Sequence, residues 1–146
     1  MKNSFLILLL AGFFSACFFI VSAKTNTPNI VITEIGASES SGLEWLELFN
    51  TNDTAITIED WVFWEDETNH KLSVAQGTST IAAGEFFIIA QDAEKLLEKY
   101  GLASTTVFDS SWGSLKEGGE EIGIKNSDGE FVEQFTYIKS ADFSLE

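Results

Sequence analysis

Residues 44–50 read Glu-Trp-Leu-Glu-Leu-Phe-Asn, and this stretch decides the class of fold. Charged and large apolar side chains alternate along it with a period near two, which is typical of a β-strand. A similar strand-like segment, Ile30–Ile35, precedes it, and Asp60-Trp61 follows it. The stretch therefore predicts a protein built from strands, and it points to a fold rather than to a reaction.

Short strand-like segments continue along the rest of the chain, separated by segments rich in turn residues. The tetrapeptide Asn-Ser-Asp-Gly at 126–129 lies between two of them and predicts a hairpin, because Gly129 takes a positive φ at little cost. Residues 65–69 are polar and predict a loop. We expect an all-β domain of about eight or nine short strands, folded as a β-sandwich. The expected strands are 30–35, 44–50, 55–58, 61–64, 71–74 (an edge strand), 86–90, 105–108, 120–125 and 130–137.

One short helix is expected among these strands. Asp92 can cap its N-terminus, Leu96, Leu97 and Tyr100 form an apolar stripe, and Gly101 ends it. Because the helix is isolated among strands, we expect it to be a crossover between the two sheets.

The N-terminus has the three parts of a secretory signal peptide. A short positive start precedes the apolar run 5–21, and small residues at Val21-Ser22-Ala23 fit a cleavage site. We expect a signal peptide at 1–23, a linker at 24–28 and one folded domain at 29–146. Two alternatives remain open: the apolar run stays as a membrane anchor, or Cys17 is acylated as in a lipoprotein.

Composition narrows the function further. The 146 residues carry a net charge of −15, and none of them is Arg. Acidic surfaces repel nucleic acid, and Arg is the side chain that best grips phosphate, so we expect no nucleic-acid partner. Cys17 is the single cysteine, so a cleaved chain contains no disulfide. A Gly-x-Ser-x-Gly elbow and a Gly-rich phosphate loop after a strand are both missing from the sequence.

The order and spacing of these pieces resemble those of bacterial lamin tail domains over nearly all of 29–146. Ile32–Ile35 resembles the opening strand of the family, and residues 44–50 match its most recognisable stretch. Residues 83–90 resemble its Pro-Gly strand with Ala83 in place of Pro, and Ser144-Leu145-Glu146 resembles its terminal motif. The residues that carry the resemblance are Glu34, Glu44, Trp45, Glu47, Asn50, Trp61, Gly84, Gly119, Gly129 and Tyr137.

The resemblance implies an immunoglobulin-like sandwich that serves as a secreted or cell-surface module, often fused to hydrolases or other binding domains. A fold of this kind does not itself supply a function. We expect a non-catalytic interaction or adhesion module that uses no cofactor and binds a protein or a cell-surface polymer. The membrane is a partner only through an uncleaved N-terminal segment. Exposed edge strands offer a further route to partners by strand addition.

Four tryptophans are candidates for the core or for a binding surface. Trp45 and Trp61 lie inside strands and are expected to pack in the core. Trp64 and Trp112 border polar loops and can be partly exposed, although packing is favoured over ligand contact for both. Exposed indoles can stack on sugar rings, so an alternative function is a carbohydrate-binding module that uses Trp64 and Trp112.

The acidic residues suggest two further alternatives. Glu34, Glu44, Glu47 and Glu133 match positions that are often acidic in the family, and Glu47 lies between Trp45 and Phe49 on one strand face. Two convergent carboxylates, Glu44 and Glu47, would be needed for a secreted hydrolase. A structural role for these acids is favoured, since short strands offer no obvious cleft.

A calcium site is the other role considered for the acids. Its candidates are Glu65, Asp66, Glu67 and Asp128, although their spacing does not match a dedicated calcium loop. His70 is the single histidine, and we expect it to be a solvated loop residue.

Overall fold

The computed structural model describes residues 30–37 and 42–138. The expected signal peptide, linker, Cys17 and terminal Ser144-Leu145-Glu146 motif lie outside these residues.

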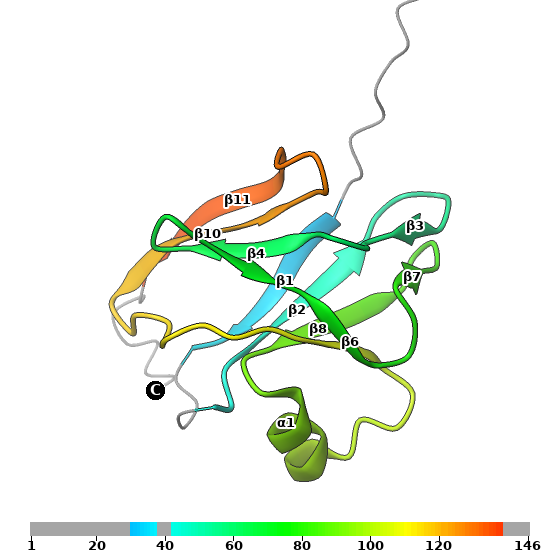
Figure 1. Ribbon diagram of the computed structural model, residues 1–146, viewed down its shortest axis with the longest axis horizontal. Helices are drawn as coiled ribbons and strands as arrows, with labels where there is room; N and C mark the ends of the chain where they lie inside the picture. The colour runs from blue at the N-terminus through cyan, green and yellow to red at the C-terminus, as the bar shows by residue number, and fades with distance from the viewer. Residues whose placement is uncertain (1–29, 38–41, 139–146) are drawn as a thin grey trace, which may run out of the picture.

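Two β-sheets face each other and form an immunoglobulin-like all-β sandwich (Figure 1). The first sheet has five strands in the order β1 (Ile30–Gly36), β2 (Trp45–Asn50), β8 (Phe86–Ala90), β9 (Thr106–Asp109) and β6 (Ser73–Gln76). The second has four strands in the order β11 (Phe131–Ile138), β10 (Gly119–Lys125), β4 (Val62–Glu65) and β5 (Thr68–Lys71). The short strands β3 (Ile56–Thr57) and β7 (Thr80–Ile81) pair with each other. The predicted fold class is therefore confirmed.

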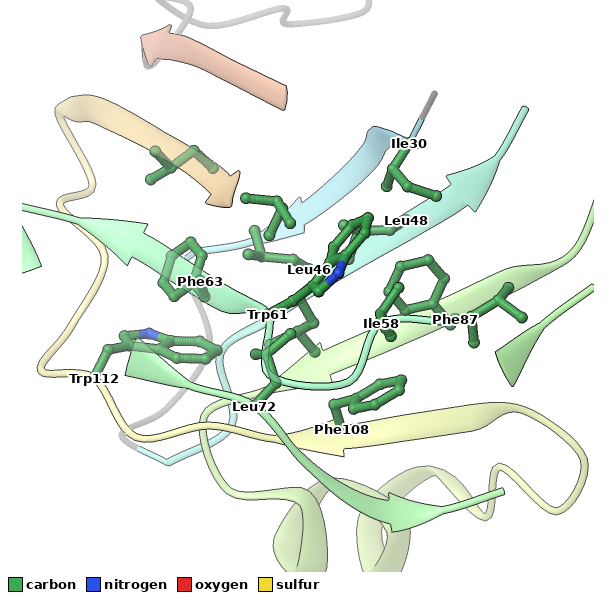
Figure 2. Packing of buried hydrophobic residues seen from close by; sticks show 14 of the residues in the cluster. Ile30, Leu46, Leu48, Ile58, Trp61, Phe63, Leu72, Phe87, Phe108 and Trp112 are labelled. Carbon is green, nitrogen blue, oxygen red and sulfur yellow. The ribbon is translucent and has the colours of Figure 1, made fainter. Parts of the chain in front are cut away.

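Side chains along residues 44–50 point alternately to the inner and the outer face of the five-stranded sheet. Leu46 and Leu48 point into the space between the sheets and are fully buried, whereas Trp45, Glu47 and Phe49 lie on the outer face. The core is completed by Phe63 from the opposite sheet and by large apolar side chains of β8 and β9 (Figure 2). Burying each of these side chains contributes about 1.5–3 kcal/mol, so the sandwich is stabilised mainly by this layer.

Of the tryptophans Trp45, Trp61 and Trp112, Trp45 alone lies away from its expected position. Trp61 is buried in the core as predicted, at 4% exposure. Trp112 is also buried in the core, at 7% exposure, so it has the packing role that the sequence favours rather than the alternative role of an exposed indole. Trp45 is partly buried on the outer face, where it packs against a second apolar cluster beneath the helix, so its predicted position in the main core is wrong. The cause is the register of Trp45 on β2, because a residue one position along a strand points to the other face.

The helix α1 (Ala93–Tyr100) forms as predicted. The Asp92 side chain accepts a hydrogen bond from Lys95 N at 3.1 Å, and Gly101 ends the helix in the left-handed conformation. It connects β8 to β9, which are parallel neighbours in one sheet, so the predicted crossover between sheets is wrong. A parallel pair needs such a crossover, and the helix covers part of the outer face of its own sheet (Figure 1). Within the described residues, no helix has the length and apolar character that a membrane span requires.

The two hairpins of the four-stranded sheet differ in how well they could be predicted. β10 and β11 pair across residues 126–129, and Gly129 has φ 78°, as expected. Residues 65–69 were expected to be a loop, but they form the hairpin of β4 and β5. Its two-residue turn places Asp66 at φ 46° and Glu67 at φ 62°, where Gly or Asn is more usual. This hairpin and the short β7 explain why the described chain has eleven strands rather than eight or nine.

Two of the residues that carry the family resemblance hold turns together. The buried amide Nδ2 of Asn50 donates hydrogen bonds to the carbonyls of Thr54, Ile81 and Ala82 at 2.9–3.2 Å. Gly119 has φ 101°, and a Cβ there would lie 2.2 Å from the carbonyl oxygen of Tyr137. Asn50 therefore joins β2 to the connection before β8, and Gly119 allows β10 to begin against β11.

Candidate functional site

The outer face of the five-stranded sheet carries a row of unusual side chains. Trp45, Glu47 and Phe49 follow one another on β2, and their partners on β8 are Ala90, Ile88 and Phe86. The Phe49 and Phe86 rings lie 4.5 Å apart between centroids. Aromatic rings and a carboxylate share a sheet face that the helix covers only in part (Figure 1). Part of this apolar surface is therefore not covered by the helix.

A hollow of about 310 Å³ lies on this face beside the helix. Its lining consists of Trp45, Glu47, Ile88, Leu96, Tyr100 and Leu102. The side chains of Ile88 and Leu96 are buried and belong to the apolar cluster under the helix, while Tyr100 is 44% exposed. The hollow therefore has apolar and aromatic surfaces, with one carboxylate at its side.

A second hollow, also of about 310 Å³, lies next to the first. The two share Glu47, Ile88 and Leu102. The second is further lined by Glu85 and by Phe86, which is 50% exposed. We call the two hollows together the outer-face groove. β8 lies under both, and five residues of strand span roughly 16 Å, which is enough for a short extended segment of a ligand.

Glu47 is held in the groove by its neighbour on β1. The pairing of β1 with β2 shifts register between Ile32 and Glu34, and Thr33 lies at this irregularity. The Thr33 hydroxyl donates a hydrogen bond of 2.7 Å to Oε1 of Glu47. Glu34 is the cross-strand partner of Glu47, so a second carboxylate flanks the groove. The site thus has a local negative charge with a fixed orientation.

Trp45 is held close to the sheet by a glycine. Gly36 is its cross-strand partner, and a Cβ at Gly36 would lie 2.4 Å from the Trp45 indole nitrogen. The indole therefore lies directly over the Gly36 backbone. This close approach sets the position of the aromatic wall of the groove.

Glu44 does not take part in this surface, because it points to the opposite side of the strand. It is 3% exposed, and its Oε2 accepts hydrogen bonds of 2.9 Å from Trp112 Nε1 and from Leu115 N. Glu44 and Glu47 therefore lie on opposite faces of the sheet and do not form the convergent pair that a hydrolase needs. Glu44 instead fixes the connection between β9 and β10 to the core.

Two more buried carboxylates surround the same connection. Nε2 of His70 lies 3.1 Å from Oε1 of Glu65, and Nδ1 of His70 lies 2.6 Å from the carbonyl of Ser111. The predicted solvated loop position of His70 is wrong, because its side chain is 12% exposed and belongs to β5. Burial, followed by the charge of Glu120, raises the pKa of Glu65.

Glu120 and Tyr137 complete this second cluster. Oε1 of Glu120 accepts hydrogen bonds from Lys116 N at 2.6 Å and from the Tyr137 hydroxyl at 3.1 Å, and Oε2 lies 3.3 Å from Lys116 Nζ. Burial, with the charge of Glu120 as the next cause, raises the pKa of Tyr137. These side chains form hydrogen bonds with one another and with the backbone, so the cluster stabilises the fold.

The calcium candidates are not brought together. Asp66 and Glu67 form the turn after β4, whereas Asp128 lies in the turn after β10. Glu65 pairs with Ile122 and Val62 with Lys125, so these two turns lie at opposite ends of the sheet. Asp66 is already paired with Lys116 at 3.2 Å. Nowhere in residues 30–37 and 42–138 do three His, Cys, Asp or Glu side chains form a group able to hold a metal ion.

Trp64 remains on the outer face of the four-stranded sheet. It makes an edge-to-face contact with Phe131, 5.2 Å between centroids, and Nζ of Lys125 lies 5.2 Å from its ring. Trp112 is unavailable to a ligand, because it is buried against Phe63. The two candidate ligand-binding tryptophans therefore share no surface, because Trp64 lies on an outer face and Trp112 lies in the core.

Most residues of the outer-face groove do not stand out as a site in the sequence. In the sequence, Tyr100 belongs to the apolar stripe of the helix and Phe86 to an apolar strand, and neither position indicates a groove. The signal that could have found them was the alternation itself, because Trp45 and Glu47 share the face opposite to Leu46. The contribution of Leu102 could not be read, since it depends on how the chain after the helix folds back.

The fold and this surface define an immunoglobulin-like β-sandwich with a hollowed outer face. A model of the Lamin Tail Domain family matches residues 23–139. The chain therefore belongs to the lamin tail domain family, and the resemblance seen in the sequence is confirmed. A search of curated proteins finds no match.

Proposed function

We propose that this chain is a non-catalytic binding module and that the outer-face groove is its binding surface. The observation that carries the proposal is the pair of adjoining hollows, each about 310 Å³, lined by half-exposed aromatic side chains around Glu47. Small clefts that combine apolar walls with a few placed polar groups are the usual form of a ligand site. The buried carboxylates, by contrast, are engaged with backbone and side-chain donors, and they support structure rather than a reaction.

The test compares the two outer faces of the sandwich. Tyr100→Ala with Phe86→Ser removes exposed aromatic surface from the groove, and Trp64→Ala with Phe131→Ser removes it from the opposite sheet. Each protein is titrated with a panel of soluble cell-wall polysaccharides and short peptides, after circular dichroism has shown that all variants fold. The proposal predicts ligands whose binding is lost in the groove variant alone. Ligands lost only in the Trp64 variant would contradict it.

A carbohydrate-binding module remains the second candidate. The observation in its favour is that two aromatic rings, the partly buried Trp45 and the exposed Tyr100, line one hollow, and sugars stack on such rings. A carbohydrate site built from Trp64 and Trp112 is not supported, because Trp112 is buried and Lys125 lies over Trp64. The polysaccharides in the panel test directly whether Trp45 and Tyr100 bind sugars.

We further propose that the module acts outside the cell, as a secreted or cell-surface protein. The signal-like segment 1–23 and the net charge of −15 support this proposal. Mass spectrometry of the protein exported by a secreting host tests it, with a mature chain that starts at Lys24 as the expected result. Retention of residues 5–21 would favour the membrane anchor, and loss of a lipid label in Cys17→Ala would favour the lipoprotein.

A further inference from the structure

We propose that the occupant of the outer-face groove is an extended peptide segment that bears a basic side chain two residues away from an apolar one. The inference rests on the proposed function, since it names the class of partner for that surface. Its basis is the distribution of charge and apolar surface along the groove.

The groove has two chemically different halves. In the half beside the helix, Leu96, Tyr100 and Leu102 surround Trp45, so this half suits an apolar side chain. In the other half, Glu47 and Glu85 lie beside the exposed Phe86 ring. A carboxylate next to an aromatic face attracts an ammonium or guanidinium group through both charge and cation–π contact.

The spacing of the two halves matches an extended chain. Trp45 and Glu47 are two residues apart on β2 and point to the same side. Side chains on one face of an extended ligand also repeat every two residues, roughly 6.6 Å apart. A ligand strand that lies along β2 and β8 can therefore place an apolar side chain near Trp45 and a basic side chain near Glu47.

The carboxylate at the centre of the groove can accept a further donor. Oε1 of Glu47 accepts the Thr33 hydroxyl, and within the described residues no hydrogen bond reaches Oε2. Glu34, opposite Glu47 on β1, is exposed and adds a second negative charge on the same side. A basic side chain would pair with this negative charge, which a neutral sugar would not do.

Among the residues that line the groove, none carries a positive charge. Nζ of Lys99 lies 4.7 Å from the centre of the Tyr100 ring, and no Lys is among the residues that line either hollow. Together with the net charge of −15, this disfavours anionic polymers and favours cationic partners at long range. Lys99 beside Tyr100 would repel a basic side chain, so the half of the groove beside the helix is assigned to the apolar side chain of the ligand.

The test uses two copies of Leu-Ser-Lys-Ser as the peptide, which places Leu and Lys alternately on one face. Leu-Ser-Glu-Ser repeats and a block-ordered peptide of the same composition as the first serve as controls. We expect saturable binding of the first peptide only, weakened about tenfold between about 50 mM and about 500 mM salt. Glu47→Gln should weaken it by about fivefold, whereas Glu130→Gln, the same charge change on the exposed distant hairpin, should leave it within about twofold.

The outcomes separate this inference from the proposed function. Equal binding of the Lys and Glu peptides, or equal effects of Glu47→Gln and Glu130→Gln, would overturn the inference. A polysaccharide that binds in a Tyr100-dependent manner while the Lys peptide does not would also overturn it, yet would uphold the groove as a binding surface. Binding of the Lys peptide that survives Tyr100→Ala with Phe86→Ser would overturn both.

Discussion

The indole Nε1 of Trp112 donates a hydrogen bond of 2.9 Å to Oε2 of Glu44, across 68 positions of sequence. The bond joins the start of β2 to the connection between β9 and β10, in the buried interior. It explains why an acidic residue precedes a core strand, since a buried carboxylate persists where donors are built around it.

Removal of this donor is predicted to destabilise the fold. In Trp112→Phe, Glu44 keeps the Leu115 amide but loses the indole, and the smaller ring leaves a gap beside Phe63. We expect a loss of about 2–4 kcal/mol in the free energy of unfolding, measured by urea denaturation. The half-exposed Trp64→Phe serves as the matched control and should cost less than about 1 kcal/mol. Equal losses in the two variants would contradict the assigned role of Glu44.

The contact between Gly36 and Trp45 yields a second prediction. In Gly36→Ala the new methyl group meets the indole ring, which must move away from the sheet. We expect a loss of about 1–3 kcal/mol and a shift of the tryptophan emission to longer wavelength. Gly84→Ala is the control, because Gly84 has φ 70° but no atom lies within 4 Å of a Cβ placed there. It should cost about 1 kcal/mol from strain alone and leave the emission unchanged.

Stability is predicted to depend on pH through Glu65. Its pKa is raised above the ordinary 4.5 by burial and by the charge of Glu120, so the folded state binds a proton more tightly than the unfolded state does. This contribution is complete below pH 4.5 and is lost as pH rises through the raised pKa of the folded state. The melting temperature should therefore contain a contribution from Glu65 that decreases as the pH is raised from acid to neutral.

Glu65→Gln removes that component. The Gln amide can donate to Nε2 of His70 while Nδ1 of His70 donates to Ser111, so the connection stays in place without a buried charge. We expect the variant to melt about 2–5 °C higher than the parent at neutral pH, with the two curves converging in acid. A constant difference at all pH values, as for a change unrelated to titration, would count against the account.

The turn of β4 and β5 offers a stabilising change. Asp66 and Glu67 both have positive φ, a conformation that Asn-Gly adopts with less strain. Replacement of the pair by Asn-Gly should raise the free energy of unfolding by about 1 kcal/mol, because the exposed ion pair of Asp66 with Lys116 contributes little. The same replacement at the exposed Glu94-Lys95 pair in the helix should destabilise. Destabilisation by the turn replacement would mean that the ion pair outweighs the strain.

Trp45 and Trp112 show which features of the fold can be predicted from the sequence and which cannot. Alternation along residues 44–50 placed Leu46 and Glu47 on different faces, and the cap and stop residues of the helix were legible because they are local. Which face was outward could not be read at Trp45, since the covering helix comes from residues about fifty positions later. The buried position of His70 could not be predicted for the same reason, because its partner Ser111 is distant in sequence. The burial of Trp112 is favoured by the sequence, but its distant partner Glu44 could not be identified from it.

The most direct test of the central claim is a two-dimensional NMR titration of the four indole N–H signals, assigned by single Trp→Phe variants. The Lys-bearing peptide and the panel polysaccharides serve as ligands. If the outer-face groove is the binding surface, the Trp45 signal moves in a saturable way, while those of Trp61, Trp64 and Trp112 stay in place. Movement of the Trp64 signal with Trp45 unchanged, or no movement of Trp45 with any ligand, would contradict the account.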